Sequence, residues 1–432
     1  MSIYFLSRCC FLRSYCVRIP HRKALKVEAF KGIHRFIKVL CMRIAIIAEY
    51  YLPEINGVVY HMEALRKGLI EAGHEVLILK PDFKAKHYHI TDGILYSPAL
   101  KLPNLYDYSV SYPYSKIELK LLQEWKPDIL HIHTEFSQGI FALYAARQLN
   151  VPIVYTCHTM YYDYMHYLGV FKNFKAAKSF INKSILKYTN AAKAVICAST
   201  KMEDFLKQCN VTTPIYKIPN ACITTDFAEE TLNQDQLHAL KTQYNIKPDS
   251  FAACFCGRLA AEKNLSLTLD FWKDFTADMP NCKLFIIGDG PSKDELERKA
   301  KDYGLENSVV FTGKTPHETV KYYYHLCDTY IMTSLSENHS VSALEAIACG
   351  IPVVHLYDKE NEDQYIEGVT GFAFKDSESF NKILHTIYDK KQRTGESKTL
   401  KEEINTAVAK DNYQTMAQKI LAVYKHVLAE SA

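Results

Sequence analysis

One stretch near residue 340 constrains the fold most, because it reads as a buried strand, a loop and a helix in succession. Asp328–Thr333 is apolar and β-branched, as in a short buried strand. The helical pattern that begins after Ser340 is closed by Gly350 and Pro352. A helix that starts at the carboxyl end of a parallel strand presents its N-terminus to phosphate groups. The stretch therefore predicts an α/β domain that binds a phosphorylated ligand.

Two glutamates flank the start of this helix. Glu337 falls in the loop and Glu345 lies eight positions later, inside the helix. Carboxylates on either side of an anion site can hold the neutral hydroxyls of a ligand whose phosphate lies at the helix N-terminus. The alternative is a pair of solvated surface glutamates, which is the commoner explanation for an isolated pair.

The residues around the second glutamate extend this pattern into a family signature. The order E-x7-E, in which the second glutamate opens E-A-I-A-C-G-I-P-V-V, resembles the retaining glycosyltransferases of family 4. The resemblance implies a GT-B fold, an α/β architecture in which two Rossmann-like domains face each other across a cleft. It also implies that Glu337 contacts the donor sugar and Glu345 the ribose of the nucleotide.

Length and charge narrow the class of protein. The 432 residues are enough for two or three domains, each with its own core. The net charge is +4, but residues 1–41 carry nine Lys and Arg against one acidic residue, so the remainder is net negative. Bulk charge therefore gives no support for nucleic-acid binding. The 13 cysteines include no C-x-x-C pair, which favours buried thiols in a reducing compartment.

The basic N-terminal extension, residues 1–41, leaves two interpretations open. It has no apolar run long enough to span a membrane and no secretory signal pattern. It could be a basic arm that touches a membrane, or Met42 could be the true start of the chain. The strand pattern that begins directly after Met42 favours the second interpretation.

Three further segments are predicted after the extension. Residues 42–218 form an N-terminal Rossmann-like domain that binds the acceptor, and residues 219–410 a C-terminal one that binds the nucleotide sugar. Residues 411–432 form a helix that could cross back to the first domain. The first strand, Arg43–Ala48, is not followed by G-x-G-x-x-G, which argues against a nicotinamide-dependent dehydrogenase.

Two loops of the first domain contain candidate site residues. Gly57 follows the first strand, where a side chain would obstruct a ligand, although turn geometry is an alternative explanation. His158 follows the strand Pro152–Thr156 and should face the cleft. The surrounding Y-L-P-E-I-N-G-V-V and V-Y-T-C-H-T-M-Y are similar to diacylglycerol glucosyltransferases, a narrower group within the family. The resemblance implies that Gly57 faces the donor diphosphate and that His158 contacts the donor sugar or the reacting centre.

The second domain begins with a strand, Ser250–Cys256, followed by G-R-L-A-A-E-K-N. Arg258 and Lys263 in this loop can neutralise the charge that grows on a departing nucleoside diphosphate. The alternative is two surface charges, but the position between a strand and a helix matches the family. Gly288 and Gly290 follow a later strand in G-D-G-P, and we predict that such strand-end loops form the base pocket of the nucleotide.

One segment departs from the narrower group. Glu337 is followed by Asn338, His339 and Ser340, where the group usually reads T-Q-G. These three residues are predicted to line the rim of the sugar pocket. The donor sugar is therefore open between glucose, galactose and an N-acetylated sugar.

Residues 171–187 alternate lysines with aromatic and aliphatic residues and predict an amphipathic helix. Such a helix can lie on an anionic bilayer surface, or it can pack its apolar face on the protein's own core. The resemblance to lipid-modifying enzymes favours membrane contact, and with it a cytoplasmic protein peripheral on the inner face of the cell membrane. The predicted contact residues are Phe171, Lys172, Phe174, Lys175, Lys178 and Phe180.

The resemblance implies a retaining enzyme that moves a hexose, expected to be glucose from UDP-glucose, to a lipid hydroxyl, expected to be that of diacylglycerol. Its catalytic residues would be His158, Arg258, Lys263 and Glu337. Because the chain has no D-x-D motif, we predict no cofactor and no essential metal. Three alternatives stay open: another hexosyl transfer to a ceramide-like or polyprenyl-linked acceptor, a sugar-nucleotide epimerase, and a non-catalytic nucleotide-sugar-binding membrane protein.

Overall fold

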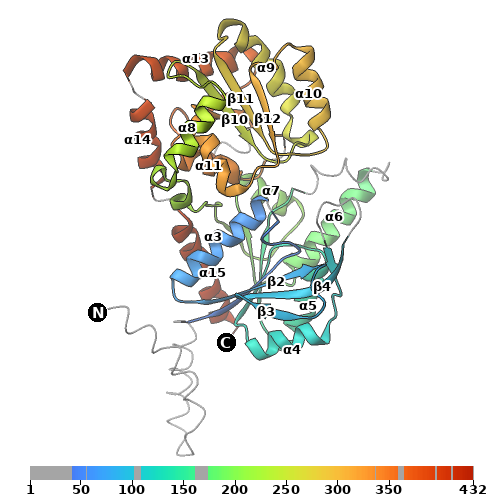
Figure 1. Ribbon diagram of the computed structural model, residues 1–432. Helices are drawn as coiled ribbons and strands as arrows, with labels where there is room; N and C mark the ends of the chain where they lie inside the picture. The colour runs from blue at the N-terminus through green and yellow to red at the C-terminus, as the bar shows by residue number, and fades with distance from the viewer. Residues whose placement is uncertain are drawn as a thin grey trace, which may run out of the picture.

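The structure is a computed structural model that contains two α/β domains, one above the other in Figure 1. Phe171 and Lys172 of the predicted membrane contact, and residues 1–40 of the basic extension, lie outside the residues that it describes. The described ranges are 41–54, 56–101, 109–160, 174–335, 337–358, 364–394, 397–409 and 412–431.

The first domain contains a nine-stranded sheet within the described residues. Its strands are β1 (Arg43–Ile47), β2 (Glu75–Asp82), β3 (His89–Thr91), β4 (Ile94–Lys101), β5 (Ser109–Ser111), β6 (Ile129–Ile132), β7 (Ile153–Cys157), β8 (Ala194–Cys197) and β9 (Ile215–Lys217). The parallel strands lie in the order β4, β2, β1, β6, β7, β8, β9. Strands β3 and β5 pair antiparallel with β4. The sequence pattern does not predict either one, because a three-residue edge strand has no readable period.

Helices cover both faces of this sheet, as a parallel sheet requires. They are α3 (Gly57–Glu71), α4 (Lys116–Trp125), α5 (Ser137–Leu149), α6 (Phe174–Thr189) and α7 (Thr200–Gln208). The central strands are buried along their length, which explains why they read as continuous apolar runs.

The second domain contains a six-stranded parallel sheet in the described residues. Its strands are β10 (Phe251–Cys256), β11 (Cys282–Ile287), β12 (Val309–Gly313), β13 (Thr329–Met332), β14 (Val353–Leu356) and β15 (Gly371–Phe374). Its helices are α8 (Gln234–Gln243), α9 (Leu265–Asp278), α10 (Lys293–Asp302), α11 (His317–Leu326), α12 (Val341–Ala348), α13 (Ser377–Thr394) and α14 (Ser397–Val408). The spatial order β12, β11, β10, β13, β14, β15 reverses between β10 and β13, where open α/β sheets bind ligands.

The chain crosses between the domains twice. Ile218 and Ala221 pack in the core of the first domain, whereas Phe227 packs in the core of the second. After α14, helix α15 (Tyr413–Glu430) returns and packs beside α3, as Figure 1 shows in red and blue. Its buried Tyr424 also reaches the sheet, where the Tyr424 hydroxyl lies 2.6 Å from His131 Nδ1.

Gly68 explains how closely α15 approaches α3. A Cβ atom at Gly68 would lie 2.6 Å from Ala417 Cβ and 3.2 Å from the Tyr413 carbonyl oxygen, both in α15. Glycine in mid-helix is unfavourable by itself, so its presence here is accounted for by this contact. Three residues after Gly68, at the end of α3, Glu71 Oε1 accepts a hydrogen bond from the Tyr413 hydroxyl at 2.8 Å.

We expect Gly68→Val to weaken the docking of α15. The added side chain must displace helix backbone, and such overpacking usually costs about 1–3 kcal/mol. Calorimetry should show a lower melting temperature for the first domain. Ile70→Ala is the matched control, because Ile70 is on the exposed side of the same helix and its loss should change little. An unchanged melting temperature for Gly68→Val would contradict the close helix contact.

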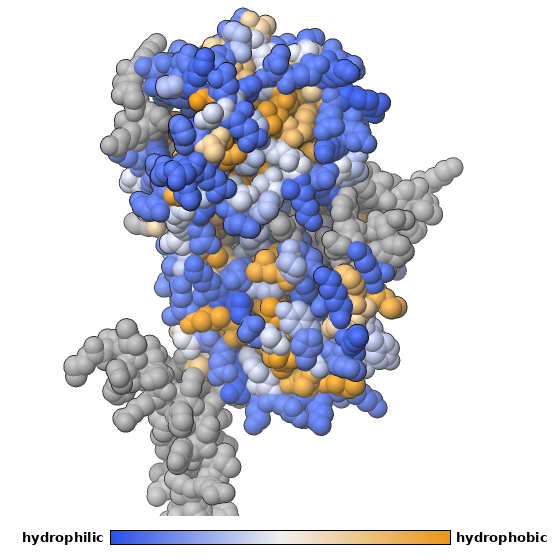
Figure 2. All heavy atoms as spheres, in the orientation of Figure 1, coloured by the Kyte–Doolittle hydropathy of each residue, from blue (hydrophilic) through white to orange (hydrophobic). Residues whose placement is uncertain are grey.

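No helix in the described part of the chain is long and apolar enough to cross a bilayer. Figure 2 shows a mostly hydrophilic surface interrupted by apolar patches. Most of the exposed large hydrophobic residues belong to the first domain: Ile70, Phe83, Ile90, Leu100, Tyr112, Tyr114, Ile117, Phe136 and Phe180.

Candidate active site

Two of the predicted site residues form an ion pair at the switch point of the second sheet. Lys263 ends the loop after β10, and Glu337 lies in the loop after β13. Lys263 Nζ donates to Glu337 Oε1, and the two side chains are 22% and 14% exposed. Residues 74 positions apart therefore meet because β10 and β13 are neighbours in the sheet.

The ion pair also sets the charge of the glutamate. Burial raises the pKa of Glu337, but the charge and hydrogen bond of Lys263, with smaller contributions from Ser334 and Lys201, together lower it more, so the pKa lies below its usual value. Glu337 is therefore ionised at neutral pH, when it can accept hydrogen bonds but cannot donate a proton. Arg258 extends from the same loop and is exposed.

Glu345 is buried in α12 and is held by two partners of α11. His317 Nε2 lies 2.8 Å from Glu345 Oε1, and the Tyr324 hydroxyl donates to Oε2 at 3.1 Å. Tyr60 of α3, from the first domain, stacks on the His317 ring with centroids 3.8 Å apart. Sequence analysis missed His317 and Tyr60, since no local motif marks a contact between helices so far apart in the chain.

The N-termini of α3 and α12 face each other across the domain junction. The Asn56 side chain caps α3 by accepting from Val59 N at 3.0 Å, and Gly57 is the first residue of that helix. A Cβ atom at Gly57 would meet Val341, the first residue of α12, at an ordinary contact distance of 3.6 Å. The protein itself therefore has room for a side chain at Gly57, and turn geometry does not require glycine there.

Gly288 and Gly290 have a different explanation. A Cβ atom at Gly288 would lie 1.9 Å from the Gly257 carbonyl oxygen, and one at Gly290 would lie 2.3 Å from the Leu259 carbonyl oxygen. Gly288 also has a φ of +137°. These glycines let the loop after β11 pack on the loop after β10, so the close approach that they permit is to the protein's own backbone.

We expect Gly57→Ala and Gly290→Ala to separate a ligand role from a packing role. Gly57→Ala should leave the melting temperature unchanged, because the added methyl group would meet Val341 only at an ordinary contact distance. It should lower the rate of the predicted hexosyl transfer, because a bound diphosphate would clash with that methyl group. Gly290→Ala should lower the melting temperature, because the methyl group must displace backbone. Calorimetry and initial rates on both variants test this pair. Full activity of a folded Gly57→Ala variant would remove Gly57 from the donor site.

The predicted rim residues lie at the domain junction. Asn338 Oδ1 accepts from Ser199 Oγ of the first domain, and Asn338 Nδ2 donates to the His158 carbonyl oxygen at 3.5 Å. Asn220 Nδ2 donates to the His339 carbonyl oxygen at 2.9 Å. Ser340 caps α12, where its Oγ accepts from the backbone N–H of the third helical residue at 3.4 Å, so its hydroxyl has a structural partner.

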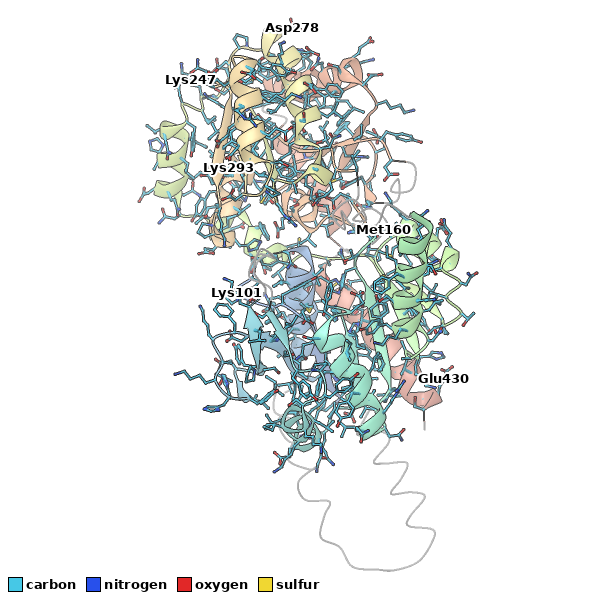
Figure 3. The ribbon with its side chains drawn as sticks, turned by 90° about the vertical axis from the view of Figure 1, so that its right-hand side faces the viewer. Lys101, Met160, Lys247, Asp278, Lys293 and Glu430 are labelled. Atoms are coloured by element: carbon cyan, nitrogen blue, oxygen red, sulfur yellow. The ribbon has the colours of Figure 1, made fainter. Side chains whose placement is uncertain are left out.

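His158 follows β7 at the level where the two domains meet. Figure 3 shows Met160, two residues later, near this junction. His133 Nδ1 lies 2.9 Å from His158 Nε2, and His61 and His131 lie beside them. The H-x-H at the end of β6 was a readable signal that the sequence analysis did not use.

Burial keeps these four histidines neutral. It lowers the pKa of His61 to about 4, although an interaction with Asn220 opposes this shift. It also lowers the pKa values of His131, His133 and His158 well below their usual range, with help from the neighbouring imidazoles. At neutral pH the group therefore offers nitrogen lone pairs and no positive charge.

The apolar residues of helix α6, which the sequence predicts to contact a membrane or the protein core, are split between the two environments. Ile181 and Ile185 are buried in the first-domain core, whereas Phe180 is 68% exposed and Lys178 is partly buried. Part of the apolar face thus packs on the protein itself. The side chains of Phe174 and Lys175 lie outside the described residues.

The family model "Glycosyltransferase Family 4" matches residues 55–225, and the model "Glycosyl transferases group 1" matches residues 238–407. The alpha-monoglucosyldiacylglycerol synthase of Acholeplasma laidlawii is 29% identical over 348 residues, which are 79% of this chain and 87% of that protein. The protein of the same description from Streptococcus pneumoniae is 28% identical, over 72% of this chain and 70% of that protein.

Solved structures establish the fold. The Anabaena protein HepE in complex with UDP and glucose has a TM-score of 0.65 and 17% identity, covering 88% of this chain and 99% of that one. Sucrose-phosphate synthase from Thermosynechococcus elongatus has a TM-score of 0.68 and 18% identity, covering 90% and 100%. At these identities the likeness shows the fold alone, and the predicted GT-B fold is confirmed.

Proposed function

The chain belongs to the family 4 glycosyltransferases, and on that premise we propose that it transfers glucose from UDP-glucose to the hydroxyl of diacylglycerol with retention at the anomeric carbon. The observation that carries the proposal is the Lys263–Glu337 ion pair at the switch point of the second sheet. The names of the two glucosyldiacylglycerol-synthesising relatives support the acceptor. The UDP and glucose in the HepE complex support the donor.

In this mechanism, charge develops as UDP leaves and the sugar becomes oxocarbenium-like. Lys263 and Arg258 would stabilise the diphosphate, together with the facing N-termini of α3 and α12. The ionised Glu337 would accept hydrogen bonds from sugar hydroxyls, which orients the ring beside Lys263. Glu345 would bind the ribose through the remaining lone pairs of its carboxylate oxygens, while His317 and Tyr324 hold the carboxylate in place.

The acceptor would approach from the first domain. His158 lies on that side of the junction, and the exposed apolar residues gather on the same domain. We propose that this domain, including Phe180 and the lysines of α6, meets an anionic membrane surface on the cytoplasmic side. Apolar side chains would enter the headgroup region while lysines pair with lipid phosphates.

One experiment separates this proposal from its alternatives. Purified protein is incubated with radiolabelled UDP-glucose or UDP-galactose and vesicles that contain diacylglycerol or ceramide, with or without anionic lipid. We expect label in the lipid phase from UDP-glucose and diacylglycerol, and NMR should show the α-anomer. Interconversion of the two nucleotide sugars without acceptor would indicate an epimerase instead. Binding of UDP-glucose with no turnover in any arm would indicate a non-catalytic protein.

A further inference from the structure

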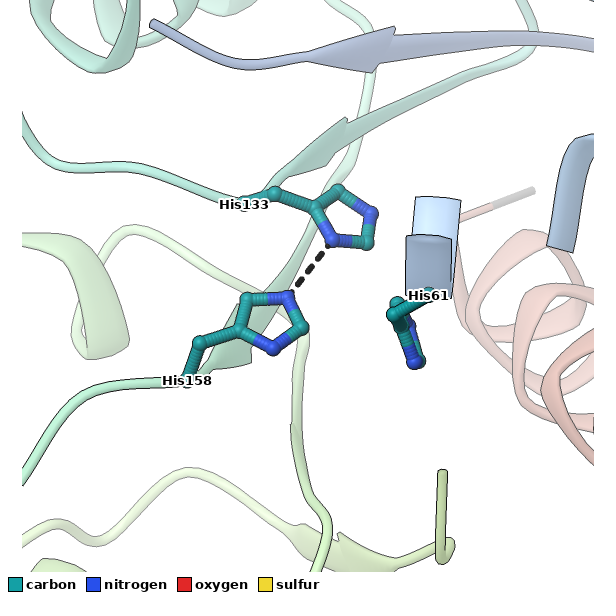
Figure 4. Close-up of side chains that lie close together, drawn as sticks. All are labelled: His61, His133 and His158. Carbon is teal, nitrogen blue, oxygen red and sulfur yellow. Dashed lines mark hydrogen bonds between the residues drawn. The ribbon is translucent and has the colours of Figure 1, made fainter. Parts of the chain in front are cut away.

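Three histidine side chains converge at the base of the domain junction from three different elements. His61 comes from α3, His133 from the end of β6 and His158 from the end of β7. One nitrogen from each ring lies within 4.8 Å of the corresponding nitrogen of the other two. Figure 4 shows the hydrogen-bonded His133 and His158 with the His61 ring beside them.

Two of these histidines have buried ring nitrogens with no hydrogen-bond partner of good geometry in the described residues. His61 and His133 are only 1% and 2% exposed. Within the described residues, both nitrogens of His61 and Nε2 of His133 have no hydrogen-bond partner of good geometry. The Asn220 side chain lies close enough to raise the pKa of His61. Buried polar atoms are nearly always satisfied, so these nitrogens call for an explanation.

The chemistry of the group suits one class of ligand. Neutral imidazoles are good ligands for Zn²⁺ and related borderline transition metals, whereas Mg²⁺ and Ca²⁺ prefer oxygen. A tetrahedral Zn²⁺ with bonds of about 2.0–2.1 Å needs nitrogens roughly 3.4 Å apart, so nitrogens that lie within 4.8 Å of one another would have to close by up to about 1.4 Å. Three histidines also leave a fourth position for water or another ligand.

We propose that His61, His133 and His158 form a transition-metal site that takes Zn²⁺ at the base of the domain junction. The His131 ring packs on His133 with centroids 4.1 Å apart and is itself fixed by Thr156 and Tyr424. This arrangement limits the rotation of His133 and preorganises the site.

Metal binding would inhibit transfer, and this second step rests on the proposed function. His158 is the site residue through which metal and donor would compete, because its carbonyl oxygen is contacted by Asn338 beside Glu337. A metal that holds the His158 side chain removes it from the donor sugar. Zn²⁺ is therefore expected to act as a reversible inhibitor rather than as a participant in the reaction.

Binding is tested first, without reference to activity. Chain without a histidine tag is freed of metal by chelator and desalted, then titrated with Zn²⁺ by calorimetry and with Co²⁺ by visible absorption. We expect one ion per chain and the absorption of tetrahedral Co²⁺. His61→Leu should weaken Zn²⁺ binding by about 100-fold or more. Removing a residue that only hydrogen-bonds to a metal ligand already lowers metal affinity by about 10–100-fold, and His61 would be a ligand itself. The leucine replaces a histidine whose ring nitrogens have no hydrogen-bond partner of good geometry in the described residues. A melting temperature equal to that of the parent chain verifies that the variant is folded.

Two further variants keep the test decisive. His133→Gln should lose Zn²⁺ as well, whereas His426→Gln, at an exposed position in α15, should bind it like the parent chain. No binding by the parent, or equal binding by the parent and both cluster variants, would overturn the site and indicate an adventitious ion only.

Activity then tests the inhibitory step. Zn²⁺ should inhibit the parent chain and leave the His61→Leu variant uninhibited at the same free concentration. If the parent binds Zn²⁺ but never transfers sugar, the proposed function fails while the metal site stands. If transfer is measured and Zn²⁺ binds without slowing it, the inhibitory role is wrong.

Discussion

Lys263→Ala is expected to lower the turnover of hexosyl transfer by about 10²-fold or more, the usual effect of removing one charge-stabilising group. Lys263 provides positive charge at the switch point of the second sheet, where the leaving diphosphate is predicted to lie. The stabilisation grows as charge moves onto UDP, so the loss should fall on turnover more than on donor binding. Initial rates at saturating UDP-glucose measure it.

The ion pair makes a control necessary, because removing Lys263 also leaves Glu337 without its cation. Calorimetry with UDP and with uridine separates the two effects. If Lys263 acts on phosphate, Lys263→Ala should weaken UDP binding and leave uridine binding unchanged. Lys293→Ala is the control for the loss of a lysine, since Lys293 forms a longer and more exposed pair with Glu297 on the surface of α10, outside the site. Unchanged turnover of the folded Lys263→Ala variant would refute the diphosphate assignment.

Glu118→Gln is expected to stabilise the first domain above pH 7 and to change little near pH 4.5. Glu118 is fully buried, and burial raises its pKa from 4.5 to about 7, although hydrogen bonds from Ser97 and Gln138 oppose the shift. Its Oε1 accepts both bonds, at 2.7 and 3.1 Å, and glutamine keeps that oxygen. The substitution therefore removes a buried charge while retaining the hydrogen bonds.

The sign follows from proton binding. Between pH 4.5 and about 7 the unfolded chain loses the Glu118 proton while the folded chain keeps it, so the free energy of unfolding falls as pH rises. Above pH 7 both states are ionised and the loss is constant. Above pH 7 the free energy of unfolding of the variant should exceed that of the parent by up to about 3 kcal/mol.

Calorimetry at low and high pH checks this difference. Glu124→Gln is the control, because Glu124 is exposed on the same helix and its pair with Lys120 should contribute less than about 1 kcal/mol at either pH. A second buried acid, Glu49, has its pKa raised to about 7 by burial, and its charge adds to the upward shift of the Glu118 pKa, so the measured difference includes the loss of repulsion between the two carboxylates. Equal stabilisation at both pH values would mean that a charge is not the cause.

Many of the predicted site residues could be found from sequence because they lie at strand ends. A strand buried on both faces reads as a short apolar run, and its carboxyl end points to the ligand edge of a parallel sheet. This located Lys263, Glu337 and His158 without coordinates. It could not show that Lys263 and Glu337 form an ion pair, because that requires β10 and β13 to be neighbours.

Contacts between elements far apart in the chain could not be predicted from the sequence either, because they also depend on how the elements pack. Nothing local marks Tyr60 as the partner of His317, or Ser199 as the partner of Asn338. Helix α6 was ambiguous because an apolar face reads alike whether it meets lipid or core. Only packing shows that Ile181 and Ile185 face inward while Phe180 faces outward.

The sequence by itself determined the α/β class, the order of strand, loop and helix around the predicted site residues, and the residue types at those strand ends. These are local properties, since apolar runs and helix caps depend on residues that are neighbours in the chain. Tertiary structure alone decided which side chains meet: the ion pair, the facing helix N-termini and the three converging histidines. Each joins segments far apart in the chain, and only the packing of the two sheets and their helices brings them within reach.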